Sequence, residues 1–128
     1  MITTPSNPTI SEIEEWAYSE EGEPHQEWEL FLIWKGEFSD YLKFASDVTC
    51  PKESFFLNLL YYWVWRNIKH KAIENELENY ESVFEEAKKV NTPYVKLWLE
   101  RSINLIKDNN FYTEEDWWHN RRPYDEIP

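Results

Sequence analysis

The chain has little of several residues on which particular structures depend. Its 128 residues include one cysteine, Cys50, so no disulfide can form within the chain. A lone cysteine is typical of reducing compartments, and we therefore expect a cytoplasmic protein. Only two glycines occur, Gly22 and Gly36. This scarcity disfavours sandwiches and barrels with many tight turns, and it leaves no material for glycine-rich phosphate loops.

Long hydrophobic runs are also missing. The most apolar stretch, FFLNLLYYWVWRNI at residues 55–68, is interrupted by Asn58, Arg66 and Asn67. A membrane-spanning helix needs about 20 apolar residues, so we expect no membrane segment. The first 16 residues have neither a basic region nor an apolar run, so we expect no signal peptide.

Basic residues are absent from the first 34 positions. These positions hold eight glutamates, two thirds of the formal net charge of −12. Such a field repels nucleic acid and anionic membranes, and it attracts basic partners. The alternative interpretation is that the acidity only keeps an aromatic-rich chain soluble.

Aromatic and aliphatic residues at helical spacing are what the chain has in quantity. Eight Trp, eight Tyr and seven Phe can fill one core in a chain of this length. The pattern predicts an all-α fold: a compact single-domain bundle or orthogonal array of five to six helices. The expected helices cover residues 11–19, 24–36, 38–47, 51–69, 74–89 and 93–108, with a last cap at Thr113. We expect a flexible N-terminal arm at 1–9, a single helical domain at 10–118 and a C-terminal tail at 119–128.

The predicted helix at 51–69 is apolar nearly all round, which is typical of a helix in the middle of a bundle. One stripe along it is weaker, and we expect that stripe to reach solvent or a partner. Its residues are Ser54, Asn58, Tyr62, Trp65 and Lys69.

Two segments nearer the N-terminus carry local signals. Ser11 and Glu14 have the spacing of a capping box and predict the first helix start. Trp28, Leu30, Leu32 and Trp34 stand at alternate positions, which also allows a strand over residues 27–34. We favour a helix there because no second convincing strand exists to pair with it.

The sequence contains no recognisable catalytic or nucleotide-binding motif. Cys50 precedes a predicted helix start, where a reactive thiol is conceivable but a plain buried thiol is commoner. The three histidines are scattered, and Glu115 and His119 are four apart, so that they could share a metal on a helix face. One such pair is too little for a metal site, so we expect no metal and no cofactor.

The C-terminal region pairs aromatic residues with arginines, at Trp117-Trp118 and Arg121-Arg122. Such residues are enriched at interface hot spots. An equally good interpretation is a lid whose tryptophans close the bundle.

Three functions of different classes are compatible with this pattern. The first is a small acidic module that binds a basic protein, as an immunity protein or antitoxin does. The second is a homodimer or assembly protein that buries the weaker stripe, and the third is an enzyme or small-ligand binder with an aromatic pocket between helices. Under the first hypothesis, the partner-binding residues are Glu14, Glu15, Glu20, Glu21, Glu23, Glu27, Trp28, Tyr62 and Trp65.

Overall fold

The structure, a computed structural model, describes residues 4–69, 74–108, 110–111, 113–118 and 122–127. The side chains of residues 74–80, 114 and 118 lie outside this description. The described residues form helices and no strand, which confirms the predicted all-α class. The helices are α1 (Ile10–Ala17), α2 (Trp28–Lys35), α3 (Phe38–Ser46), α4 (Glu53–Lys69), α5 (Glu74–Lys88), α6 (Pro93–Lys107) and α7 (Glu114–Trp118).

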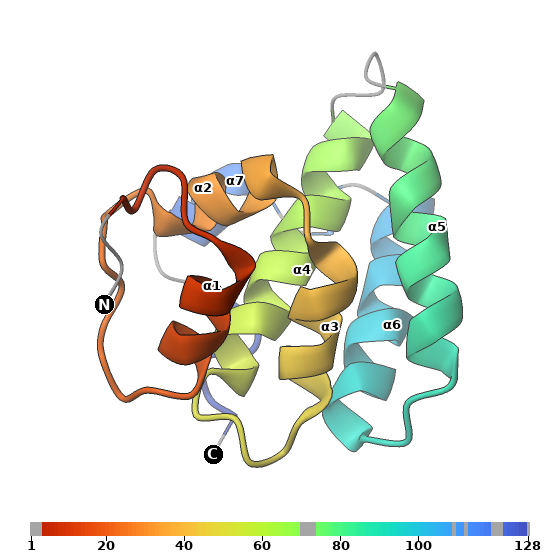
Figure 1. Ribbon diagram of the computed structural model, residues 1–128. Helices are drawn as coiled ribbons and strands as arrows, with labels where there is room; N and C mark the ends of the chain where they lie inside the picture. Colours follow the sequence, from red (N-terminus) through yellow and green to blue (C-terminus); the bar gives the residue numbers. More distant parts are fainter. Residues whose placement is uncertain (1–3, 70–73, 109, 112, 119–121, 128) are drawn as a thin grey trace.

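Helix α4 is the centre of the fold. Figure 1 shows α1 and α2 at one side of the view, α5 and α6 at the other, and α3 and α4 between them. Helices α2, α3, α5 and α6 all contact α4. All residues of α4 are buried except Ser54, Arg66 and Lys69. The apolar stretch at 55–68 is therefore core, as its all-round hydrophobicity predicts.

Aromatic rings make much of the contact between α4 and its neighbours. Phe38 of α3 stacks on Trp63 with ring centroids 3.7 Å apart. Phe56 meets Trp16 of α1 edge to face at 6.0 Å. Such ring pairs add to the burial energy of their large side chains. In the described part of the chain, no helix is both long and apolar enough to cross a membrane.

The start of α1 differs from the prediction by two residues. Thr9, not Ser11, is the N-cap: its backbone N–H donates to Glu12 Oε1 at 2.9 Å, and Glu12 N–H donates to Thr9 Oγ1 at 3.2 Å. Two S/T-x-x-E patterns overlap here. A start at Thr9 also brings Ile10 into the helix, where it packs against the core.

Residues 28–35 form a helix, so the strand alternative for residues 27–34 is wrong. The helix begins at Trp28 rather than at Pro24. Gly36 ends it with φ of +77°, a left-handed conformation that glycine adopts without steric cost. This C-terminal stop is where the sequence predicts it.

The described part of the C-terminal segment, residues 122–127, packs against the helices. Tyr124 is buried, and its ring meets Tyr61 of α4 edge to face at 6.0 Å. Arg101 of α6 donates to the carbonyl of Pro123 at 3.3 Å. The predicted division into a domain at 10–118 and a tail at 119–128 therefore does not hold for these residues, which contribute to the core.

Candidate functional site

The structure gathers six glutamates on one end of the molecule. We call the exposed side chains of these residues the acidic surface: Glu14, Glu15, Glu20, Glu21, Glu23 and Glu27. They belong to the end of α1 and the segment that connects it to α2. No lysine or arginine occurs between the first and the last of them in the chain. All six glutamates predicted as partner-binding residues are thus accessible to a partner.

An open hollow adjoins the acidic surface. It has a volume of about 410 Å³, and its lining includes Glu14, Glu15 and Tyr18. Tyr18 is 43% exposed, and its hydroxyl donates to Asp47 Oδ2 at 2.7 Å. This hydrogen bond is the main reason that the pKa of Tyr18 rises to about 12, so the phenol stays protonated. The hollow thus offers carboxylates beside a fixed aromatic ring.

The segment that carries the acidic surface is tied to the core by a tryptophan and a lysine. The indole N–H of Trp16 donates to the carbonyl of Gly22 at 3.0 Å. Lys52 Nζ donates to the carbonyl of Ser19 at 2.5 Å and lies 4.7 Å from the centroid of the Trp16 ring. Lys52 is therefore engaged with backbone and ring, and these contacts tie the segment to Trp16 and Lys52.

The three aromatic residues proposed as partner-binding are not accessible, so this part of the prediction is wrong. Trp28, Tyr62 and Trp65 are 0%, 2% and 4% exposed. Trp28 packs edge to face on Trp16 at 5.4 Å, and Trp117 of α7 stacks on Tyr62 at 4.7 Å. Two residues of the weaker stripe of α4, Asn58 and Tyr62, contact the C-terminal region of the same chain. Tyr62 and Trp65 are therefore buried within one chain, and the homodimer stays a prediction.

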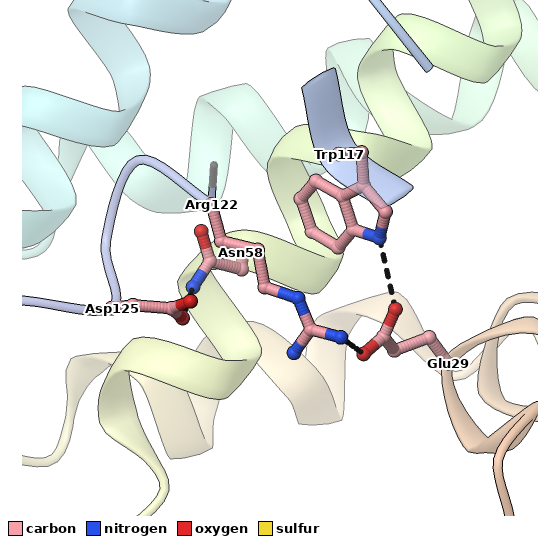
Figure 2. Close-up of polar contacts among 5 residues, drawn as sticks. All are labelled: Glu29, Asn58, Trp117, Arg122 and Asp125. Atoms are coloured by element: carbon pink, nitrogen blue, oxygen red, sulfur yellow. Dashed lines mark hydrogen bonds and ion pairs between the residues drawn. The ribbon is translucent and has the colours of Figure 1, made fainter. Parts of the chain in front are cut away.

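Beneath the acidic surface lies a buried polar group that the sequence analysis did not select. We call it the Glu29 cluster: Glu29 of α2, Trp117 of α7 and Arg122 (Figure 2). Trp117 Nε1–H donates to Glu29 Oε2 at 2.9 Å, and Arg122 Nη2 forms an ion pair with Glu29 Oε1. The guanidinium also lies over the Trp117 ring, 5.3 Å from its centroid. One carboxylate of α2 thus holds two residues of the C-terminal region, Trp117 and Arg122.

The Glu29 carboxyl has an unusual pKa. Burial is the main cause, and it raises the pKa of Glu29 to about 7. The neighbouring Glu23 carboxyl also raises it, by a hydrogen bond and by its charge, whereas Arg122 and Trp117 lower it. Glu23 thus links the acidic surface to the Glu29 cluster.

A second polar contact holds the C-terminal segment on α4 (Figure 2). Asn58 Nδ2 donates to Asp125 Oδ1 at 2.6 Å, and its Oδ1 accepts from the Tyr124 backbone N–H at 3.0 Å. Asn58 is fully buried in the middle of an apolar helix. Both ends of its amide are therefore satisfied by the segment that covers it.

Replacing Asn58 by alanine is expected to destabilise the protein by about 1–3 kcal/mol, because the buried Tyr124 N–H loses its acceptor. The free energy of unfolding from urea titration measures this change. Asn67→Ala is the matched control, since buried Asn67 donates only to the carbonyl of Trp63 within α4. Limited proteolysis should show faster cleavage near residue 124 in the Asn58 variant alone. Equal cleavage in both variants would contradict the role assigned to Asn58.

The sequence did contain signals for these residues. Glu29 is the single charged residue in WELFLIW, residues 28–34, and Asn58 is the single polar residue in the run 55–65. A charged or polar side chain inside an apolar segment needs a partner when it is buried. What the sequence could not supply was the identity of the partners, which lie at the other end of the chain.

The remaining candidate groups offer little chemistry. Cys50 is buried, its Sγ donates to the carbonyl of Ala17 at 3.3 Å, and burial raises the pKa of its thiol. This is the plain buried thiol, and the reactive alternative is wrong. Among the described residues, no group of three or more His, Cys, Asp or Glu could hold a metal ion. His70 and His119 lie outside these residues.

The chain matches no protein-family model, no curated protein and no solved structure.

Proposed function

We propose that this chain is a protein-binding domain that docks on a basic protein through its acidic surface. The observation that carries the proposal is the set of six exposed glutamates on one continuous segment that has no lysine or arginine. Carboxylates gathered in this way steer a cationic partner during encounter and set its orientation.

Tyr18 takes the place of Trp28 and Trp65, the tryptophans that the sequence suggested as partner-binding residues. It is exposed beside Glu14 and Glu15, and its hydrogen bond to Asp47 restricts its movement. A tyrosine held in this way presents apolar area at low entropic cost, which is a common property of interface hot spots. The acidic surface would supply attraction, and Tyr18 would supply short-range contact.

The most specific form of the proposal is an inhibitor of a nuclease-type toxin, as immunity proteins and antitoxins are. A nuclease carries a cationic surface because it must bind phosphates. An acidic domain that covers this surface competes directly with nucleic acid.

Neutralising part of the acidic surface is expected to slow association with the partner about tenfold or more, because steering depends on local charge. The test variant carries Glu14→Gln, Glu20→Gln and Glu21→Gln. The control variant carries Glu81→Gln, Glu85→Gln and Glu86→Gln on α5, which are also exposed. Both variants lose three negative charges, so only the position of the change differs.

The measurement has two stages. Immobilised wild-type and variant proteins are exposed to a lysate of the source cells, and bound proteins are eluted with a salt gradient. Association rates are then measured with the purified basic protein that the wild type retains, and its nuclease activity is measured with and without the domain. If both variants retain the same protein with the same salt dependence, the acidic surface is not the docking site.

A further inference from the structure

A second surface, which carries lysines rather than a cluster of glutamates, lies between α5 and α6. It is an open groove with a volume of ≈ 470 Å³. We call it the α5/α6 groove and define it by its apolar residues Ala87, Leu99 and Ile103 and by the lysines Lys88, Lys96 and Lys107. In Figure 1, α5 and α6 lie on the other side of α3 and α4 from α1, so the groove is remote from the acidic surface.

The α6 residues of the groove form one face of the helix. Lys96, Leu99, Ile103 and Lys107 follow one another at spacings of three and four, so their side chains line up along the axis. Lys96 and Lys107 are 11 residues apart, which corresponds to about 16 Å along a helix. The groove therefore has an aliphatic centre and a cation at each end of α6.

The charge of the groove contrasts with that of the chain. Three lysines and one glutamate, Glu100, line it, whereas the whole chain has a net charge of −12. Lys88 pairs with Glu85 at 2.8 Å, and both side chains are exposed, so this ion pair is weak. Lys96 and Lys107 have no ion pair with any residue that the structure describes. Two lysines thus remain free to bind an anionic group.

The aliphatic centre of the groove is also without a cover. Ile103 is 36% exposed, although neighbouring positions on α6 such as Trp98 and Leu105 are fully buried. A partly exposed aliphatic strip lined by three lysines and one glutamate favours a partner of net negative charge.

We propose that the α5/α6 groove binds an acidic amphipathic helix of a partner protein. Aliphatic side chains of that helix would contact Leu99 and Ile103, and its carboxylates would pair with Lys96 and Lys107. The charge complementarity selects an acidic segment, and the spacing of the lysines selects carboxylates about three helical turns apart. The domain would then hold a basic protein at one surface and an acidic segment at the other.

The probe for this proposal is a fluorescently labelled amphipathic peptide of about 18 residues, long enough to span the groove as a helix. It carries glutamates about 11 residues apart and leucines at helical spacing between them. A second peptide has glutamines in place of the glutamates. Fluorescence anisotropy with the full-length protein is expected to show saturable binding of the acidic peptide and at least about tenfold weaker binding of the neutral peptide.

The variant Lys96→Glu with Lys107→Glu is expected to raise the Kd for the acidic peptide at least about tenfold, because both charge pairs become repulsive. Lys35→Glu with Lys43→Glu, on α2 and α3, is the matched control and should leave the Kd unchanged. Ile103→Asp tests the aliphatic contact independently. All of these positions are at least partly exposed, so the variants are expected to fold, and circular dichroism checks this.

Two results would overturn the proposal. One is the absence of saturable binding of the acidic peptide. The other is an equal loss of binding in the groove variant and the control variant. Anionic lipid vesicles serve as a separate probe: if they bind through Lys96 and Lys107 while the peptide does not, the groove recognises a membrane surface and the peptide proposal fails.

Discussion

Replacing Trp117 by alanine is expected to lower the free energy of unfolding by about 3–5 kcal/mol, the range for removing a large buried aromatic side chain. Trp117 is fully enclosed although it belongs to the short helix α7 near the end of the chain. Its ring stacks on Tyr62 of α4, and its indole N–H donates to Glu29 of α2. The substitution therefore leaves a cavity and also removes a hydrogen bond from a buried carboxyl.

Trp117→Phe separates these two contributions. Phenylalanine keeps most of the ring contact with Tyr62 but cannot donate to Glu29, so we expect a smaller loss of about 1.5–3 kcal/mol. Trp34→Ala is the control, because Trp34 is 63% exposed and its removal should change stability by less than about 0.5 kcal/mol. Urea titration gives all three values. If Trp117→Ala were as mild as Trp34→Ala, α7 would not be part of the folded core.

The helices could be predicted because their signals are local. The spacing of apolar residues gave the position of α4, and Gly36 gave the end of α2. Thr113 caps α7 as predicted, since its Oγ1 accepts from the Asp116 N–H at 3.2 Å. Each of these features depends on residues only a few positions apart. Where two local signals overlapped, as at Thr9 and Ser11, packing decided between them.

The Glu29 cluster and the covering of α4 could not be predicted in the same way. A helical wheel identifies which side of α4 is weaker, but it does not show what covers that side. Tyr62 is covered by Trp117, and Asn58 binds Tyr124, which is 66 positions away in sequence. Glu29 and its partner Trp117 are 88 positions apart. Periodicity carries no information about such pairs, so side chains expected at a surface were found in the core.

The exposure of the acidic surface could be predicted for a physical reason. Glutamates are rarely buried without a partner, so a glutamate-rich segment with no cations is expected to stay in water. All six glutamates of the acidic surface follow this expectation. Glu29 is the exception within the same region of the sequence, and it has Arg122 and Trp117 as partners.

Replacing Glu29 by glutamine is expected to reduce the dependence of stability on pH. The pKa of Glu29 rises from an ordinary value of 4.5 to about 7 in the folded protein, so the folded state favours the protonated form. The stabilisation from this group is complete below the unfolded pKa and is lost as pH rises through the folded value. By this linkage, the wild type should lose about 2–3 kcal/mol between pH 5 and pH 8 through Glu29 alone. Glutamine has nearly the same shape and can still accept from Trp117, but it does not ionise.

Comparing the change of unfolding free energy with pH in the wild type and in Glu29→Gln separates the effect of Glu29 from that of the other acids. Burial also raises the pKa of Glu53 and Asp125, so these groups make stability fall with pH in the same direction. They remain in both proteins, and their contributions cancel when the unfolding free energies of wild type and variant are compared at each pH. Glu27→Gln, in the exposed part of the same region, should keep the wild-type slope. Suppose that Glu29→Gln also kept the wild-type dependence of the unfolding free energy on pH. The buried carboxyl would then be ionised throughout pH 5 to pH 8, and its ion pair with Arg122 would outweigh the cost of burial.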